Sequence, residues 1–93
     1  MSRPPLIADL ALDDENVDKM WVHGISPEQV VEMVYNNPRV AVNRKGRRGD
    51  YLVIGRDNNG ACIAMPIEPT SEDTTWRPIT AWYCKESEEA RLR

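Results

Sequence analysis

The sequence predicts an α+β fold in which two N-terminal helices pack on a four-stranded antiparallel sheet and a short C-terminal helix follows. Three observations predict it. Helix start signals and a helical spacing of apolar residues fill residues 13–35. After Pro38 the apolar period changes to two, which is typical of strands, and the short connections favour antiparallel pairing. The charged segment over residues 86–92 indicates the last helix.

The chain length allows one folded domain. Its 93 residues fall within the usual size of a single domain. We expect residues 13–93 to form this domain and residues 1–12 to form an extended N-terminal arm. Consecutive prolines make residues 1–5 a frayed lead-in, because they cannot start a helix interior. Residues 6–12 read equally as a short strand or as part of the arm.

Two local signals define the predicted N-terminal helices. Asp13 and Asp14 offer side-chain caps for a helix that runs to about Val22 and stops at Gly24. The segment Ser26-Pro27-Glu28-Gln29 combines an N-cap serine, a proline at the first helical position and a glutamine that closes a capping box. This second helix should run to about Tyr35.

The second half of the chain has the pattern of strands and tight turns. Glycine-containing turns are predicted at 45–49 and 57–60. The predicted strands cover residues 39–44, 51–55, 61–67 and 76–83. Because Pro66 cannot donate to a ladder, we expect the third strand to lie at an edge or to end there. In the fourth strand we expect Trp82 in the core and Tyr83 on a groove floor.

The composition excludes several classes of protein. With 41% hydrophobic and 29% charged residues, the chain is too apolar for disorder and too polar for a membrane protein. Cys62 and Cys84 could pair, but the N-terminus lacks a secretory signal pattern, so we expect buried thiols in a cytoplasmic protein. A single histidine leaves too few ligands for a zinc site, and we expect no metal or cofactor.

Charge is segregated along the chain. Residues 9–32 carry seven acids against one lysine, whereas residues 39–56 carry six bases against one acid. A local basic patch can attract a phosphate backbone even when the net charge of the protein is −3. A solvated hairpin is the simpler interpretation of the same residues, and both stay open at this point.

The sequence lacks most catalytic motifs. It has no glycine-rich phosphate loop, no nucleophile elbow and no cysteine–histidine metal spacing. One histidine, a set of arginines and a small sheet are compatible with metal-free RNA cleavage, in which the 2′-hydroxyl attacks its own phosphate.

The chain resembles the BrnT-like toxins of type II toxin–antitoxin systems, which are small RelE-like ribonucleases. Five stretches over residues 13–92 carry the resemblance by their order and spacing. They are His23-Gly24-Ile25-Ser26, Asn37-Pro38, Leu52-Val53-Ile54-Gly55-Arg56, Arg77-Pro78-Ile79-Thr80-Ala81, and a charged C-terminal helix with Glu88 and Arg91. The resemblance implies a RelE-like fold, RNA as substrate and an antitoxin-like protein as partner.

Site residues can be assigned on this basis. The catalytic candidates are His23, Arg56, Arg77 and Glu88, and the RNA-binding candidates are Arg44, Lys45, Arg47, Arg48 and Tyr83. His23 would transfer protons, because the ordinary pKa of histidine lies near neutrality, or would fix the turn between the helices. Arg77 would face the groove or stack on an indole. Glu88 would orient an arginine or simply be solvated.

Departures from the family pattern support an alternative. Val22 stands where the toxins usually carry a lysine, Trp82 stands where they carry an arginine, and Leu92 replaces a tyrosine. The alternative is a catalytically silent module that keeps the fold and binds a protein partner. A DNA-binding helix-turn-helix is disfavoured, because Glu28 and Glu32 make the second helix acidic.

Overall fold

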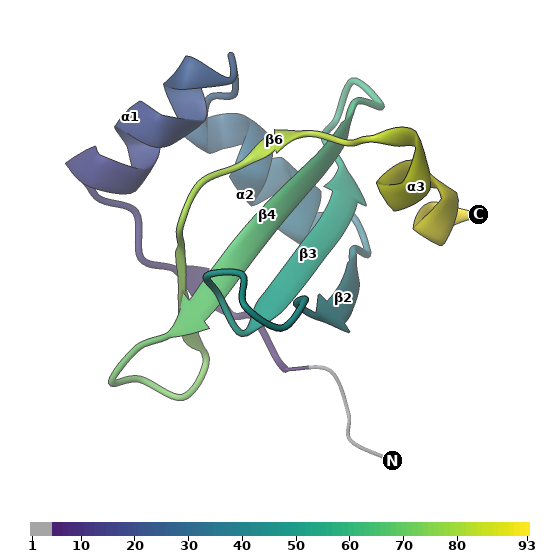
Figure 1. Ribbon diagram of the computed structural model, residues 1–93. Helices are drawn as coiled ribbons and strands as arrows, with labels where there is room; N and C mark the ends of the chain where they lie inside the picture. The colour runs from purple at the N-terminus through teal and green to yellow at the C-terminus, as the bar shows by residue number, and fades with distance from the viewer. Residues whose placement is uncertain (1–4) are drawn as a thin grey trace.

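Residues 5–93 form a six-stranded sheet with three helices (Figure 1). The computed structural model describes residues 5–93. The strands are β1 (Asp9–Leu10), β2 (Arg39–Val42), β3 (Tyr51–Arg56), β4 (Cys62–Pro69), β5 (Thr75–Pro78) and β6 (Trp82–Tyr83). The helices are α1 (Asp14–Val22), α2 (Pro27–Tyr35) and α3 (Glu86–Glu89), and a 3₁₀ turn, Ala90–Leu92, follows α3. The α+β class is therefore confirmed, whereas the predicted number of four strands is wrong.

The two additional strands have separate causes. Residues 9–10 pair with β5 in parallel, so part of the predicted N-terminal arm joins the sheet as β1. The predicted strand over 76–83 is interrupted and becomes β5 and β6, which both pair with β4. The sheet order is β1-β5-β4-β3-β2, with β6 beside β4. The first four residues of the predicted frayed lead-in over 1–5 lie outside the described residues.

The predicted helix starts are confirmed at the level of hydrogen bonds. Ser26 Oγ accepts from the Gln29 N–H at 3.2 Å, while the Gln29 side chain accepts from the Ser26 N–H at 2.9 Å. Asp13 and Asn16 form the same reciprocal capping box at the start of α1. These bonds satisfy backbone donors that the first turn of a helix leaves without partners.

The larger part of the core lies between the helices and one face of the sheet. Met20 of α1 and Val30 and Met33 of α2 are fully buried against alternate residues of β3 and β4. In Figure 1, α2 lies behind β3 and β4. At Gly55 a Cβ would lie 2.8 Å from Met33 Cγ, so the glycine permits the close approach of α2 to β3.

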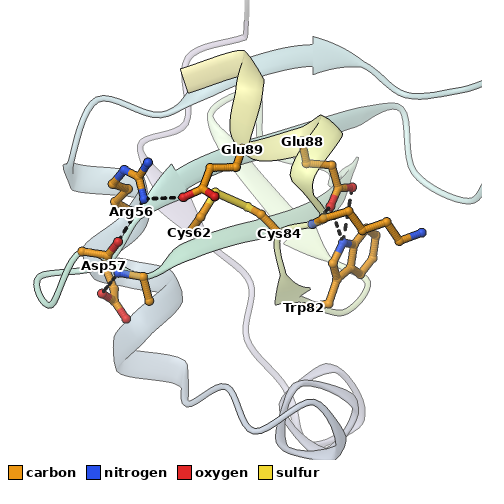
Figure 2. Close-up of a disulfide and its surroundings, with 10 residues drawn as sticks. Arg56, Asp57, Cys62, Trp82, Cys84, Glu88 and Glu89 are labelled. Carbon is orange, nitrogen blue, oxygen red and sulfur yellow. Dashed lines mark hydrogen bonds and ion pairs between the residues drawn. A yellow bond between two sulfur atoms is a disulfide. The ribbon is translucent and has the colours of Figure 1, made fainter. Parts of the chain in front are cut away.

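The other face of the sheet carries a second, smaller cluster. Ile54, Cys62 and Ala64 are buried there against Trp82 and Leu92. The prediction of two buried thiols is wrong, because Cys62 of β4 forms a disulfide with Cys84, which follows β6 (Figure 2). The β4–β6 register places the two cysteines at one end of the paired strands, which brings their side chains together.

The prediction that Pro66 marks an edge or an end of its strand is also wrong. Strand β4 continues to Pro69 and lies in the interior of the sheet, with β3 along one edge and β5 and β6 along the other. The Pro66 carbonyl accepts from the Ile79 N–H, so the missing Pro66 donor faces the break between β5 and β6. A central proline is tolerated there because no regular ladder bond is lost.

No helix within residues 5–93 has the length and apolar character needed to cross a membrane.

Reduction of the disulfide should destabilise the protein. The two cysteines are 22 positions apart, and a cross-link over a loop of this size raises the free energy of unfolding by about 3 kcal/mol in the chain-entropy model. Urea unfolding with and without a thiol reductant measures the change. The double variant Cys62→Ser/Cys84→Ser is the control and should not respond to the reductant. Identical midpoints for the wild type under both conditions, with two reactive thiols after denaturation, would mean that the disulfide does not form.

Candidate nucleic-acid interface

A basic cleft of about 400 Å³ opens on the face of the sheet that α1 and α2 do not cover. Its floor includes Leu52 of β3, Pro66 of β4 and Trp82 of β6. One wall is the segment that joins β2 to β3, and the other is the segment that carries α3 and the 3₁₀ turn. Five cationic side chains line the cleft, namely Arg44, Arg47, Arg48, Lys85 and Arg91.

The first wall is held in place by a glycine and an asparagine. Gly49 has a φ of 99°, and a Cβ there would meet Ile79 Cδ1 at 3.0 Å and the Ile67 carbonyl oxygen at 3.2 Å. Only glycine combines this backbone angle with so close a contact to the sheet. Asn43 Nδ2 donates to the Arg48 carbonyl at 3.0 Å and so closes the turn. The turn therefore presents Arg44, Arg47 and Arg48 to the cleft.

The second wall depends on Glu88. Its carboxylate accepts from Trp82 Nε1 at 3.0 Å and from the Lys85 N–H at 2.8 Å (Figure 2). These bonds fix the start of α3 against the indole and place Lys85 and Arg91 beside the cleft. Among the side chains of residues 5–93 that line the cleft, Glu88 has the only carboxylate. This carboxylate already accepts the hydrogen bonds from Trp82 and Lys85.

The floor contains an irregularity of the sheet. Between the Ala64–Trp82 pair and the Ile67–Pro78 pair, β4 has two residues, whereas the opposite segment has three. The extra residue is a bulge, which turns the following side chains to the other face of the sheet. In an unbroken strand Trp82 would share the helix-covered face with Trp76. After the bulge, Trp82 lines the cleft.

Most of the positive charge in the cleft is not neutralised. Arg48 lies 3.7 Å from Glu68, whereas the ion pairs within residues 5–93 include none to Arg44, Arg47, Lys85 or Arg91. Such a concentration of cations around a concave surface raises the local concentration of anions. Phosphate groups are suitable ligands, because arginine binds them through two parallel hydrogen bonds.

Comparison with known proteins adds no assignment. No family model matches the chain, and no match is found among the curated proteins or the solved structures. The cleft itself is therefore the basis for assigning a function.

The structure brings together only part of the predicted RNA-binding set. Arg44, Arg47 and Arg48 line the cleft, while Lys45 is exposed on the same turn and does not line it. Tyr83 lies on the opposite face, where its hydroxyl donates to the Gly24 carbonyl at 3.3 Å and accepts from Gln29 Nε2 at 3.1 Å. Trp82 instead of Tyr83 therefore lies on the floor of the cleft, and Tyr83 is 47% exposed on the other face; the bulge is the cause.

Two predicted catalytic arginines are held by carboxylates outside the cleft. Arg56 donates to Glu89 Oε2 and to the Gly60 carbonyl, both at 3.0 Å (Figure 2). Arg77 binds Asp13 at 2.9 Å and Glu68 at 3.3 Å and lies 3.7 Å from Glu15.

The pKa values of Asp13 and Arg77 are both shifted from their ordinary values. The backbone N–H of Asn16 and then the Arg77 guanidinium lower the pKa of Asp13, and the hydrogen bond that Arg77 donates to Asp13 raises the pKa of Arg77. Arg77 therefore connects α1 to β5 and β4 and is not available to a ligand in the cleft.

The remaining catalytic candidates are not adjacent to one another. His23 is exposed at the end of α1, and its backbone N–H donates to the Met20 carbonyl at 2.9 Å. Glu88 lines the cleft on the other face of the sheet. The structure thus does not assemble His23, Arg56, Arg77 and Glu88 into one site.

Sequence reasoning missed four residues of the cleft as site residues, and the first is Trp82, which was expected in the core. Lys85 and Arg91 are separated in the sequence by an acidic segment that includes Glu86 and Glu89. The sequence therefore did not indicate that these two residues form a basic wall. No sequence pattern marks Thr80 as a site residue, because the place of its side chain at the cleft depends on the bulge. Within residues 5–93, no group of three His, Cys, Asp or Glu side chains could hold a metal ion.

Asp57 holds the β3–β4 turn. It is 4% exposed, and it accepts from Gln29 Nε2 at 3.0 Å and from the backbone N–H groups of Asn59 and Ala61 at 2.9 Å. The Gln29 bond, followed by the backbone bonds, lowers the pKa of Asp57. The carboxylate therefore stabilises the folded state most when it is charged.

Loss of this carboxylate should change the acid dependence of stability. Since the folded-state pKa is below the unfolded value of about 3.9, the contribution is complete above that value and is lost as the pH falls through the folded pKa. Asp57→Ala should lower the free energy of unfolding at neutral pH by about 1–3 kcal/mol and flatten its decline in acid. Urea titrations over this pH range, with the exposed Asp18→Ala as control, measure both effects. An unchanged acid slope would contradict the role.

Proposed function

We propose that the protein binds single-stranded RNA in the basic cleft. The observation that carries the proposal is a cleft with cations on both walls. Four of these cations have no ion pair within residues 5–93, and the carboxylate of Glu88 in the lining already accepts two hydrogen bonds. Single-stranded nucleic acid binds to positively charged grooves that follow the backbone, with aromatic side chains beside them. Trp82 supplies an aromatic surface on the floor of the cleft.

The charge distribution supports a polyanion in spite of the overall charge of −3. The acidic residues of α1 and α2 lie on the elements that cover the other face of the sheet, away from the cleft. An approaching phosphate backbone is therefore attracted by the cleft and repelled by the helices. This asymmetry orients the ligand before contact.

The resemblance to BrnT-like toxins supports RNA as the particular polyanion. On this proposal the fold is RelE-like, the chain is a toxin or derives from one, and its protein partner is antitoxin-like. A cytoplasmic location belongs to the same proposal. The disulfide is unusual for that compartment, since thiols are kept reduced there.

The proposal does not assign RNA cleavage to His23. The side chains that line the cleft include no histidine, tyrosine or cysteine, which are common proton carriers near neutral pH. His23 lies at the end of α1 and outside the cleft. Binding without histidine-dependent cleavage is thus the function that this geometry supports.

Removal of two cations from the first wall should weaken RNA binding. Arg47→Ala/Arg48→Ala should raise Kd for a short oligouridylate and lower the magnitude of the salt slope of log K by about 1.4, at about 0.7 per phosphate contact on a single strand. Fluorescence anisotropy across a range of salt concentrations measures both quantities.

A charge-matched variant is the control for this test. Lys19→Ala/Arg39→Ala also removes two positive charges, but neither residue lines the cleft. Its salt slope should equal that of the wild type. Equal losses in both double variants would show that only net charge matters, and absence of binding by the wild type would reject the proposal.

The histidine is tested separately. His23→Gln should leave the affinity for oligouridylate unchanged, because the side chain lies outside the cleft. RNA incubated with the wild type should stay intact on a denaturing gel, both with and without EDTA. Cleavage by the wild type that is abolished in His23→Gln would return the histidine to a proton-transfer role.

A further inference from the structure

We propose that Thr80 binds a phosphate of the nucleic acid, with its hydroxyl as donor to a non-bridging oxygen on the floor of the cleft. The inference rests on the proposed function and adds a neutral ligand-binding residue to the cations described above. Three observations lead to Thr80: its place in the sheet, the state of its hydroxyl and the groups that surround it.

Thr80 occupies the bulge between β5 and β6. Its neighbours Ile79 and Ala81 are both buried, whereas Thr80 is only partly buried and lines the cleft. The backbone bond from Ile79 N–H to the Pro66 carbonyl at 2.9 Å keeps this segment against β4. Bulges are frequent beside functional sites, where the irregular backbone directs a chosen side chain.

The hydroxyl of Thr80 has no hydrogen-bond partner among residues 5–93. Within residues 5–93, Thr80 Oγ1 is the single buried side-chain oxygen or nitrogen in this state. A buried hydroxyl without a partner destabilises the free protein, so its retention requires a reason. A ligand that accepts its hydrogen bond would supply one.

Rotation about χ1 connects the buried hydroxyl to the cleft. The residue is partly exposed, while its Oγ1 is turned inward. A threonine side chain has three staggered positions, so another rotamer would place the hydroxyl in the cleft and the methyl group inside. There the hydroxyl would lie between the two basic walls, which would bind the remaining oxygens of the same phosphate.

Thr80→Val tests the inference, because valine keeps the shape and removes the hydroxyl. Since a hydrogen bond to a charged oxygen is lost, Kd for oligouridylate should rise about tenfold. The melting temperature should be unchanged or higher, because an unpartnered buried hydroxyl has been removed. Thr80→Ser, which keeps the hydroxyl, should bind like the wild type.

Controls separate this inference from the proposed function. Thr75→Val alters a threonine of β5 whose hydroxyl binds Glu72 outside the cleft, and it should not change Kd. If the wild type binds and Thr80→Val binds equally well, the Thr80 inference is wrong and the cleft proposal stands. If the wild type does not bind, the cleft proposal itself fails.

The probe distinguishes a phosphate contact from a ribose contact. A phosphate contact predicts the same loss of affinity for oligouridylate and for oligodeoxyuridylate. Loss on RNA alone would assign the hydroxyl to the ribose 2′-OH and overturn the phosphate assignment. In case the valine variant does not fold, three-bond couplings of the Thr80 methyl carbon in the wild type report χ1. The same inward rotamer in free and bound protein would reject the inference.

Discussion

Strand β4 must be covered on both faces and paired along both edges, and the rest of the molecule is arranged around this requirement. Its first six residues, from Cys62 to Ile67, are all buried. Ile63, Met65 and Ile67 face the helices, while Cys62 and Ala64 face the smaller cluster under the C-terminal segment. A continuous apolar strand of this kind cannot lie at an edge or on a solvated face. The disulfide from Cys62 adds a covalent link from β4 to the second covering layer.

The cleft follows from the way this second layer is built. Only the end of the sheet near Ile54 and Ala64 is covered by the C-terminal segment, so the surface over Leu52 and Pro66 stays open between two walls. Each wall has its own anchor: close packing at Gly49 on one side, and the Glu88 bonds on the other. Because the backbone of both walls is already fixed, binding of a phosphate by these cations costs little additional conformational entropy of the loops.

Ion pairing divides the arginines into two groups. Arg77 and Arg56 each bind a carboxylate within 3.0 Å and connect distant elements, which accounts for their place outside the cleft. Among the wall cations, Arg48 lies 3.7 Å from Glu68, and the other four have no ion pair within residues 5–93. Residues of one chemical type therefore have different roles, and the difference lies in whether a carboxylate is near. The sequence alone does not display this, because Asp13 and Arg77 are far apart along the chain.

Local features were determined by the sequence itself. The α+β class, both helix starts and the turns at 45–49 and 57–60 depend on groups a few residues apart, such as the Ser26–Gln29 capping box. Tertiary structure decided the pairing of β1, the disulfide and the composition of the cleft. A single extra residue at Thr80 reversed the faces of Trp82 and Tyr83, and the fold of the C-terminal segment brought Lys85 and Arg91 opposite Arg47. The physical reason is that strand register is set by packing across the whole sheet, and a shift of one position exchanges every side chain between its two faces.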